Sequence, residues 1–410
     1  MPLPDIIHLY QGTSRRFWQT RVKIGIPDTP QYIVPVASFL HSEEQKKKKK
    51  KKSSEISIMG SLAPTIVPPG GLVLVTGVNG FLASHIALNL LERGYKVRGT
   101  VRSQEKADWI TEAIAKRYPD ASFETALVPN ISAPGAFNEA IRGVDGIAHV
   151  ASDLSFGSDP NKVITPMLEA LRHILTSAAK EPSVKRFVLT SSAIAALTPQ
   201  PEQAIHVDTN TWNDSSIERA WRPAPYEPER CWDVYAALKT STERELWRFA
   251  QENNPAFVVN AVLPDFIVGP IIHARQNGST GRWVKEFFDD PVHYSKPLQT
   301  FIPRHFVDVT DVALLHLAGL THEDVQSERL LAFAGPFNFN SWLHVFRQID
   351  PAKPWPADDP NQVHDRSTVD TRRSKELLKR YSRLDFTSFF DSVRDNCLNS
   401  DPEWKRSNFP

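Results

Sequence analysis

A tyrosine and a lysine stand four residues apart in the segment Tyr235-Ala-Ala-Leu-Lys239. On a helix, positions i and i+4 project from the same face. An ammonium group beside a phenol stabilises the phenolate and lowers its pKa, so that the phenol can act as an acid near neutral pH. The pattern occurs often by chance, and its weight depends on a dinucleotide-binding turn earlier in the chain.

Two serines end the apolar segment RFVLTSS at 186–192. A hydroxyl at the end of a buried strand can hydrogen-bond the carbonyl oxygen of a substrate. We favour Ser192 for this role because it lies nearer the carboxyl end of the expected strand. Ser191 remains the alternative.

The segment TGVNGFLASH contains a turn of small residues, Gly77, Gly80 and Ala83. It follows an apolar segment, LVLVT, and opens an amphipathic helical pattern. Glycines in such a turn let the backbone approach a pyrophosphate, whose charge meets free N–H groups at the helix N-terminus. This position between strand and helix is what a dinucleotide-binding motif requires.

The end of the second expected strand, VRGTVRS, carries no carboxylate that could hold an adenosine ribose hydroxyl and favour NAD. Arg102 and Lys106 lie there instead, and two cations suit a 2′-phosphate. We therefore predict NADPH as the cofactor. Glu105 argues weakly against this, and the two cations could also be ordinary solvated charges.

Strand-like and helical segments alternate from residue 72 to residue 263. Strands are expected at 72–76, 95–101, 186–192 and 257–263, and helices near 104–118, 162–179 and 233–253. Such alternation indicates a parallel sheet covered by helices on both faces. The proline- and tryptophan-rich region 197–230 is expected to form a long excursion over the carboxyl edge of the sheet.

The composition of the 410 residues, with 41% hydrophobic and 10% aromatic side chains, indicates a globular protein. No stretch of 18 apolar residues is present, so we expect no membrane span. The two cysteines, Cys231 and Cys397, cannot build a disulfide framework and suit a reducing compartment. We expect a cytoplasmic protein without a metal site.

Residues 1–58 differ from the rest, because they lack periodicity and end near seven consecutive lysines, Lys46–Lys52. A solvated, disordered tail is the preferred interpretation, and a nuclear-localisation or anion-binding patch is the alternative. Translation could also begin at Met59. The remaining 352 residues carry 37 basic and 42 acidic groups, which does not predict nucleic-acid binding.

Together these motifs resemble the extended short-chain dehydrogenases/reductases, and more narrowly the fungal NADPH-dependent aldehyde and ketone reductases related to dihydroflavonol reductase. The matching segments are LVLVTGVNGFLASH, GYKVRGTVRSQEKA, GAFNEAIRGVDGIAHVAS, SVKRFVLTSS, YAALKT, NAVLPDFIVGP and FVDVTDVALLHLAGL. They span about three-quarters of the chain. The resemblance implies an α/β fold, a Rossmann-type doubly wound parallel sheet with a smaller C-terminal substrate-binding lobe.

The resemblance also implies roles for individual residues. Ser192, Tyr235 and Lys239 would form the catalytic set, and Tyr235 and Lys239 would also contact the cofactor. Phe81 and Leu82 would lie near the pyrophosphate. The remaining cofactor contacts would be Asn130 near the adenine, Ala151 on the nicotinamide side and Pro264 beside the nicotinamide, with Gly77, Gly80, Ala83, Arg102 and Lys106 from the motifs above.

Three places in the chain depart from the pattern of the family. Asn130 stands where an aspartate is usual, and Asp265 stands where relatives commonly have asparagine. In the helix expected at 162–179, Ala170, Leu171 and His173 replace a Gly-Thr pair followed closely by asparagine. Local packing near the cofactor is therefore expected to differ from that in relatives.

The predicted function is NADPH-dependent reduction of an aldehyde or ketone to the alcohol, with Tyr235 as general acid. A non-catalytic dinucleotide sensor and an NAD-dependent hydroxysteroid dehydrogenase or epimerase of the same fold are the alternatives. Phe156 is the first candidate for a substrate contact, followed by Trp212, Trp221 and Phe266. The partner is a small-molecule carbonyl substrate; we expect no nucleic acid, no membrane, and a monomer or homodimer.

The predicted division of the chain places an N-terminal extension at 1–68 and the reductase unit at 69–410. Within this unit we expect the nucleotide-binding core at about 70–265. The substrate lobe is expected mainly at 266–400, with the loop 197–230 added to it.

Overall fold

The computed structural model describes residues 65–276, 280–294 and 301–401. The predictions for residues 1–58, disorder and a start at Met59, lie outside these ranges. Within them, strands and helices alternate as the sequence predicts. Among the described residues, no helix is both long and apolar enough to cross a bilayer.

A seven-stranded, fully parallel sheet forms the centre of the fold, with the order β10-β7-β5-β4-β1-β2-β3. The strands are β1 (Leu72–Val75), β2 (Lys96–Val101), β3 (Phe123–Leu127), β4 (Gly146–His149), β5 (Arg186–Thr190), β7 (Val258–Pro264) and β10 (Arg329–Ala332). The strand order reverses at β1. In open parallel sheets, ligands bind in the crevice at the carboxyl ends of the strands where this reversal occurs.

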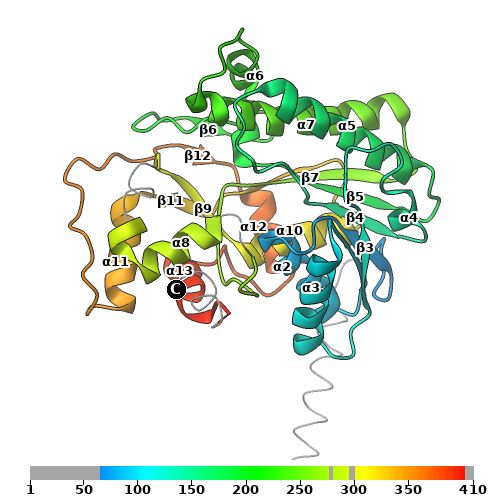
Figure 1. Cartoon of the computed structure of the whole chain (residues 1–410), viewed down its shortest axis with the longest axis horizontal. Coiled ribbons are helices and arrows are strands. Elements are labelled where there is room, and N and C mark those ends of the chain that lie inside the picture. Colours follow the sequence, from blue (N-terminus) through cyan, green and yellow to red (C-terminus); the bar gives the residue numbers. More distant parts are fainter. Residues whose placement is uncertain (1–64, 277–279, 295–300, 402–410) are drawn as a thin grey trace, which may run out of the picture. The chain divides into compact units, whose positions relative to one another are not determined.

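Helices cover both faces of the sheet (Figure 1). One face carries α2 (Phe81–Glu92), α3 (Gln104–Arg117) and α10 (Val309–Thr321). The other carries α4 (Asn138–Ile141), α5 (Pro160–Ala179) and α7 (Cys231–Asn253). Because both faces are covered, β1, β4, β5 and β7 are almost fully buried apolar strands, as the sequence pattern predicts.

Local sequence signals set where two of these helices begin. Asp159 caps α5 by accepting a hydrogen bond from the N–H of Asn161 at 3.0 Å, and Pro160 occupies the first helical position. Asp308 caps α10 through the N–H of Thr310 at 2.8 Å. These caps supply acceptors for N–H groups that have no partner within the helix.

The C-terminal lobe contains a second sheet of three strands and its own aromatic core. Its elements are β8 (Phe266–Val268), β9 (Arg304–Asp308), β11 (Gly335–Phe337), α8 (Thr280–Asp289), α11 (Phe339–Ile349) and α13 (Phe389–Asn399). This lobe follows directly after β7, so the residues at the end of β7 lie at the junction of the two sheets.

The excursion at 197–230 forms a short strand, β6 (His206–Val207), a helix, α6 (Asp214–Ala220), and a 3₁₀ turn, η2 (Pro228–Arg230). β6 pairs with β12 (Thr368–Val369), which precedes α12 (Arg372–Lys379). A further 3₁₀ turn, η1 (Ala193–Ala195), follows β5. In Figure 1, α6 lies beside α7 on the outer side of the sheet.

The chain returns from the lobe to the large sheet through α10 and β10. β10 pairs with β7 in parallel, with Arg329 opposite Ala261 and Ala332 opposite Pro264. The division predicted from the sequence assigns α10 and β10 to the substrate lobe. A four-residue edge strand so far along the chain has too little hydrophobic periodicity to be recognised as part of the large sheet.

Candidate active site

The turn after β1 holds Gly77 at φ +65°, a left-handed conformation that glycine adopts without steric cost. The N–H of Gly77 donates to Thr100 Oγ1 at 3.0 Å, and a side chain at Gly77 would lie 3.4 Å from Ala151. On β2, a Cβ at Gly99 would come within 2.3 Å of the Val78 side chain. The turn is therefore packed closely between β2 and the end of β4, and the fold brings Gly77 and Ala151 together.

Gly80 forms the N-cap of α2, and no described side chain caps this helix. The N–H groups of the first turn are therefore free to donate hydrogen bonds, and such groups bind phosphate at helix N-termini. Phe81, Leu82 and Ala83 form that first turn and are buried. These residues fit a pyrophosphate at the position that the sequence predicts.

Two further residues fix this crevice, and sequence reasoning missed both. Gln276 donates from Nε2 to the carbonyl of Gly80 at 3.1 Å and to Ser84 Oγ at 2.9 Å. Thr76 Oγ1 accepts the N–H of Ala151 at 3.0 Å and so links β1 to the end of β4. Each contact joins residues more than seventy positions apart, so no local pattern could reveal it.

Arg102 follows β2 directly, and Lys106 lies in the first turn of α3. Neither side chain forms an ion pair or hydrogen bond with any described residue, and Arg102 is exposed. Glu105, the residue that argues against a phosphate site, is engaged elsewhere, because Arg275 lies 3.6 Å from its carboxylate. Both predicted cations thus remain available for an anionic ligand.

Asn130 and Pro264 lie at the carboxyl ends of β3 and β7. Asn130 is exposed, and its Oδ1 accepts the N–H of Ser132 at 3.0 Å within the loop that follows β3. Pro264 is buried and ends β7 beside Ala332 of β10. Their roles as cofactor contacts stay predictions.

The predicted catalytic residues meet where β5 ends against α7. Tyr235 and Lys239 lie in the first half of α7, and Ser192 follows β5. The Ser192 hydroxyl lies close enough to the Tyr235 phenol to lower its pKa. The fold thus places two hydroxyls, which can bind one carbonyl oxygen together, beside each other at the edge that carries the dinucleotide turn.

Lys239 is buried, and its ammonium donates to the carbonyl oxygen of Thr190 at 3.4 Å. Burial lowers the pKa of Lys239 to about 8, and the negative charge of Glu243 opposes this shift. His149, another buried group near the lysine, has its pKa lowered to about 3 by burial and by the charge of Lys239, so it is neutral.

Burial raises the pKa of Tyr235, while the positive charge of Arg304 and the nearby Ser192 hydroxyl lower it. The negative charge of Asp265 raises it. The cation that acts on the phenol in this structure is therefore Arg304. The predicted influence of Lys239 on the Tyr235 pKa stays a prediction.

The two candidate serines differ in their partners. Ser191 donates from Oγ to Glu243 Oε2 at 2.6 Å, in a fully buried contact. Ser192 Oγ accepts only a long hydrogen bond of 3.4 Å from the N–H of Ile194, besides its contact with Tyr235. The Ser191 hydroxyl is thus committed to a structural contact, which favours Ser192 as the substrate-binding serine.

Asp265, one of the departures from the family pattern, has a defined structural role. Its Oδ1 accepts from Arg304 Nε at 2.6 Å, and its Oδ2 accepts the N–H of His305 at 3.1 Å. The carboxylate therefore ties the end of β7 to the first residues of β9. An asparagine could not balance the charge of Arg304.

Aromatic rings extend from Tyr235 toward the C-terminal lobe. The Phe156 ring lies 5.2 Å from that of Tyr235 and 5.1 Å from that of Trp232, measured between ring centroids. Trp232 also contacts Phe301 at 6.3 Å, and Phe301 contacts Phe266 at 5.7 Å. The weakly predicted substrate contact, Phe156, is thus adjacent to the phenol, whereas Phe266 is reached only through intervening rings.

The other two candidate aromatic residues lie elsewhere. The Trp212 ring is covered by two guanidinium groups, Arg329 at 3.8 Å and Arg244 at 4.3 Å. Trp221 ends α6 and is exposed. Neither makes a ring contact with Tyr235 in the described parts of the chain.

The unusual residues of α5 contribute to packing. Ala170 and Leu171 are buried in the core between α5 and the sheet. His173 is half-buried, and its carbonyl oxygen accepts from Ser177 Oγ at 2.9 Å. The expected difference in local packing from relatives stays a prediction.

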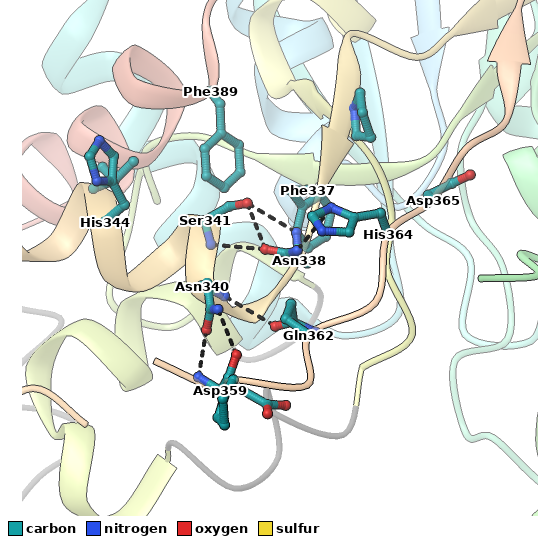
Figure 2. A pocket seen from close by; sticks show the side chains of 13 residues that line it. Phe337, Asn338, Asn340, Ser341, His344, Asp359, Gln362, His364, Asp365 and Phe389 are labelled. Carbon is teal, nitrogen blue, oxygen red and sulfur yellow. Dashed lines mark hydrogen bonds between the residues drawn. The ribbon is translucent and has the colours of Figure 1, made fainter. Parts of the chain in front are cut away.

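A separate cavity of about 600 Å³ lies in the C-terminal lobe (Figure 2). It is lined by Pro336, Phe337, Asn338, Asn340, Ser341, His344, Val345, Asp359, Pro360, Gln362, His364, Asp365 and Phe389. Figure 2 shows that its polar groups mostly bond one another, for example Asn338 with Ser341. None of the predicted site residues lines it. In the described residues, no cluster of three or more His, Cys, Asp or Glu side chains could hold a metal ion.

Comparison with known proteins gives relatives over most of the chain. The chain matches the "NAD dependent epimerase/dehydratase family" over residues 73–331. It is 55% identical to an NAD-dependent epimerase/dehydratase of Aspergillus terreus over 81% of this chain and 98% of that protein. It is 41% identical to aldehyde reductase 2 of Sporidiobolus salmonicolor over 82% of this chain and 98% of that protein.

Solved structures show the same fold. The yeast methylglyoxal/isovaleraldehyde reductase Gre2, complexed with NADPH, matches with a TM-score of 0.66 and 26% identity, over 79% of this chain and 96% of that one. Vestitone reductase from alfalfa matches with a TM-score of 0.62 and 22% identity, over 82% and 98%. These findings confirm the Rossmann-type fold and the resemblance inferred from the motifs. The chain belongs to the NAD dependent epimerase/dehydratase family, within the extended short-chain dehydrogenases/reductases.

Proposed function

We propose that this protein reduces an aldehyde or ketone to the alcohol with NADPH. The observation that carries the proposal is the placement of Ser192, Tyr235 and Lys239 together, where β5 ends against α7 at the carboxyl edge of the sheet. Relatives named aldehyde reductase and ketoreductase, and the NADPH-bound structure of Gre2, confirm the expected class, an oxidoreductase acting on carbonyl groups.

NADPH is the cofactor that the comparisons support, and the residues present fit it. The uncapped N-terminus of α2 suits the pyrophosphate, and the left-handed Gly77 lets the backbone approach it. Arg102 and Lys106 would hold the 2′-phosphate, since neither is engaged by a described partner. When bound, NADPH supplies the hydride for the carbonyl carbon.

The chain's own residues position the carbonyl and move the proton. Ser192 and Tyr235 would both hydrogen-bond the carbonyl oxygen and polarise it. Tyr235 then gives its proton to the oxygen as negative charge develops there. Lys239, whose pKa of about 8 leaves it mostly protonated at neutral pH, would hold the nicotinamide ribose and help return a proton from water.

The substrate would lie against Phe156, on the side of the phenol where Trp232 is exposed to solvent. The Phe156 ring is an apolar surface next to the phenol, and the Trp232 ring extends that surface. We therefore propose that the carbonyl compound carries an apolar substituent, and that Phe156 contacts it.

Replacement of Tyr235 by phenylalanine tests the proposal, because it removes the acid and keeps the ring. We expect turnover of NADPH with a carbonyl substrate to fall by about 10²-fold or more, while NADPH still binds. Ser191→Ala is unsuitable as a control, since Ser191 supports the neighbouring strand end. Thr242→Ala serves instead, because Thr242 lies on the same helix and its hydroxyl donates only to backbone carbonyls of that helix, those of Leu238 and Lys239. Unchanged turnover in Tyr235→Phe would refute the assignment.

A dinucleotide sensor would bind NADPH tightly and show no turnover with any carbonyl compound. An NAD-dependent dehydrogenase or epimerase of the same fold would prefer NADH in the same assay. Running both nucleotides in parallel therefore separates the three functions.

A further inference from the structure

Glu243 is a carboxylate with no exposed surface that lies outside the predicted catalytic set. It accepts two short hydrogen bonds of 2.6 Å each, from Ser191 Oγ and from Arg329 Nε. Trp247 Nε1 adds a third, longer bond of 3.3 Å. One side chain of α7 is thereby joined to the end of β5 and to β10.

Arg329 extends this contact to the excursion that crosses the carboxyl edge. Its Nη1 donates to the carbonyl oxygens of Thr209 and Thr211, at 2.7 and 2.8 Å. The Trp212 ring stacks on its guanidinium at 3.8 Å. The pair of Glu243 and Arg329 therefore connects α7, β5, β10 and the loop after β6.

This buried pair lies directly behind the proposed catalytic residues. Glu243 is one helical turn after Lys239, and its partner Ser191 is the neighbour of Ser192. The titratable groups that interact electrostatically with Lys239 are Glu243 on its own helix and His149 on β4, which is neutral. Tyr235 lies one helical turn before Lys239 on α7. Glu243 is thus the sole negative charge that acts on the lysine among the described residues.

We propose that Glu243 is a positioning residue for the reduction. Its carboxylate fixes the end of β5 against α7, so that Ser192 lies beside Tyr235, and it places a negative charge one helical turn after Lys239. This inference rests on the proposed carbonyl reduction.

The two parts of the role have separate physical consequences. Loss of the Ser191 contact lets the strand end move relative to the helix, and misplacement of a reacting group by about 1 Å can cost about 10²-fold in rate. Loss of the charge removes the interaction that favours protonated Lys239. Its pKa then falls further below its ordinary value.

Three variants separate position from charge. Glu243→Gln keeps the size and removes the charge, Glu243→Asp keeps the charge and shortens the reach, and Ser191→Ala removes only the tether to β5. The measurements are kcat, KM for NADPH and the alkaline limb of the pH profile of kcat/KM, which reports groups of the free enzyme.

For Glu243→Gln we expect kcat to fall about tenfold or more, with little change in KM for NADPH, and the alkaline limb to move to lower pH. For Glu243→Asp and Ser191→Ala we expect the lower kcat with the alkaline limb in its wild-type position. If the role of Glu243 were purely structural, the alkaline limb would not shift in Glu243→Gln while staying in place in Glu243→Asp and Ser191→Ala.

Glu245→Gln is the matched control. Glu245 lies on the same helix and is also nearly buried. It forms ion pairs with Arg172 at 2.7 Å and with Arg248 at 2.6 Å, but it does not contact the end of β5. We expect this variant to lose thermal stability while keeping the wild-type kcat and pH profile.

Removal of Glu243 alone leaves Arg329 buried without its partner, which can prevent folding. The double variant Glu243→Gln with Arg329→Met removes both charges and is expected to fold with the alkaline limb still at lower pH. A wild-type kcat and a wild-type pH profile in that double variant or in Glu243→Gln would overturn the inference. A lower kcat together with a shifted alkaline limb in Glu245→Gln would overturn it as well. Wild-type protein without carbonyl turnover would instead refute the proposed function, and the inference with it.

Discussion

Lys239 is expected to destabilise the folded protein, because it is a buried cation whose negative partner is already paired with Arg329. Its pKa falls from 10.5 in the unfolded chain to about 8 in the fold. At about 1.36 kcal/mol per pKa unit, this costs about 3 kcal/mol at pH 7. Lys239→Met removes the charge and fills the space with a flexible apolar chain. The lost bond to Thr190 is worth about 1 kcal/mol, so we expect a net gain of about 2 kcal/mol.

The pH dependence of this gain identifies its cause. Below pH 8 the lysine is protonated in both the folded and the unfolded state, and the full cost is present. Between pH 8 and 10.5 only the unfolded chain keeps the proton, so the cost disappears as the pH rises. The stability advantage of Lys239→Met should therefore shrink steadily above pH 8.

Urea denaturation of wild type and variant without cofactor, at several pH values, measures this difference. Lys285→Met is the matched control, because Lys285 is also buried but is paired with Asp289 at 2.6 Å. That variant should be less stable than wild type. A Lys239→Met protein that is less stable than wild type at pH 7, or whose gain in stability does not depend on pH, would show that the buried charge of Lys239 does not destabilise the fold. We also expect this variant to lose most of its turnover.

Three other predictions concern the cofactor, the substrate and a buried carboxylate of α10. Arg102→Glu should raise KM for NADPH at least tenfold, the value of about one charge-assisted hydrogen bond, and leave KM for NADH nearly unchanged; equal effects in steady-state assays would contradict a 2′-phosphate site. Phe156→Ala should raise KM for bulky apolar ketones about tenfold through lost burial, with small aldehydes unaffected; the same increase for both substrates would show that the ring does not contact the substituent. Asp311, buried beside Asp308, has its pKa raised to about 6, so its ionisation costs stability above pH 6. Asp311→Asn should melt at higher temperature than wild type at pH 7 and lose this advantage below pH 4; a constant difference across this range would argue against the titration of Asp311.

Much of the fold could be predicted because its signals are local. The buried strands read as short apolar runs, the helices between them are amphipathic, and the glycines of the TGVNGFLASH turn mark the first crossover. The carboxyl ends of parallel strands share one edge, so Ser192 and the dinucleotide turn had to lie on the same side of the sheet. The spacing of Tyr235 and Lys239 placed both on one helix.

The remainder depends on contacts between distant parts of the chain. Gln276 reaches the turn of Gly80 from 196 residues away, and Arg304 reaches Asp265 across the junction of the two sheets. Glu243 and Arg329 form a buried pair 86 residues apart. Nothing in the local composition around these residues distinguishes them from solvated charges, and only the folded arrangement identifies their partners.

Oxidation of NADPH by the purified wild-type protein, with a panel of aldehydes, keto esters, diketones and a dihydroflavonol, tests the central claim most directly. NADH is run in parallel under the same conditions. We expect turnover with NADPH on at least one panel member and much weaker turnover with NADH. Tight NADPH binding without turnover on any carbonyl compound, or a preference for NADH, would contradict the central claim.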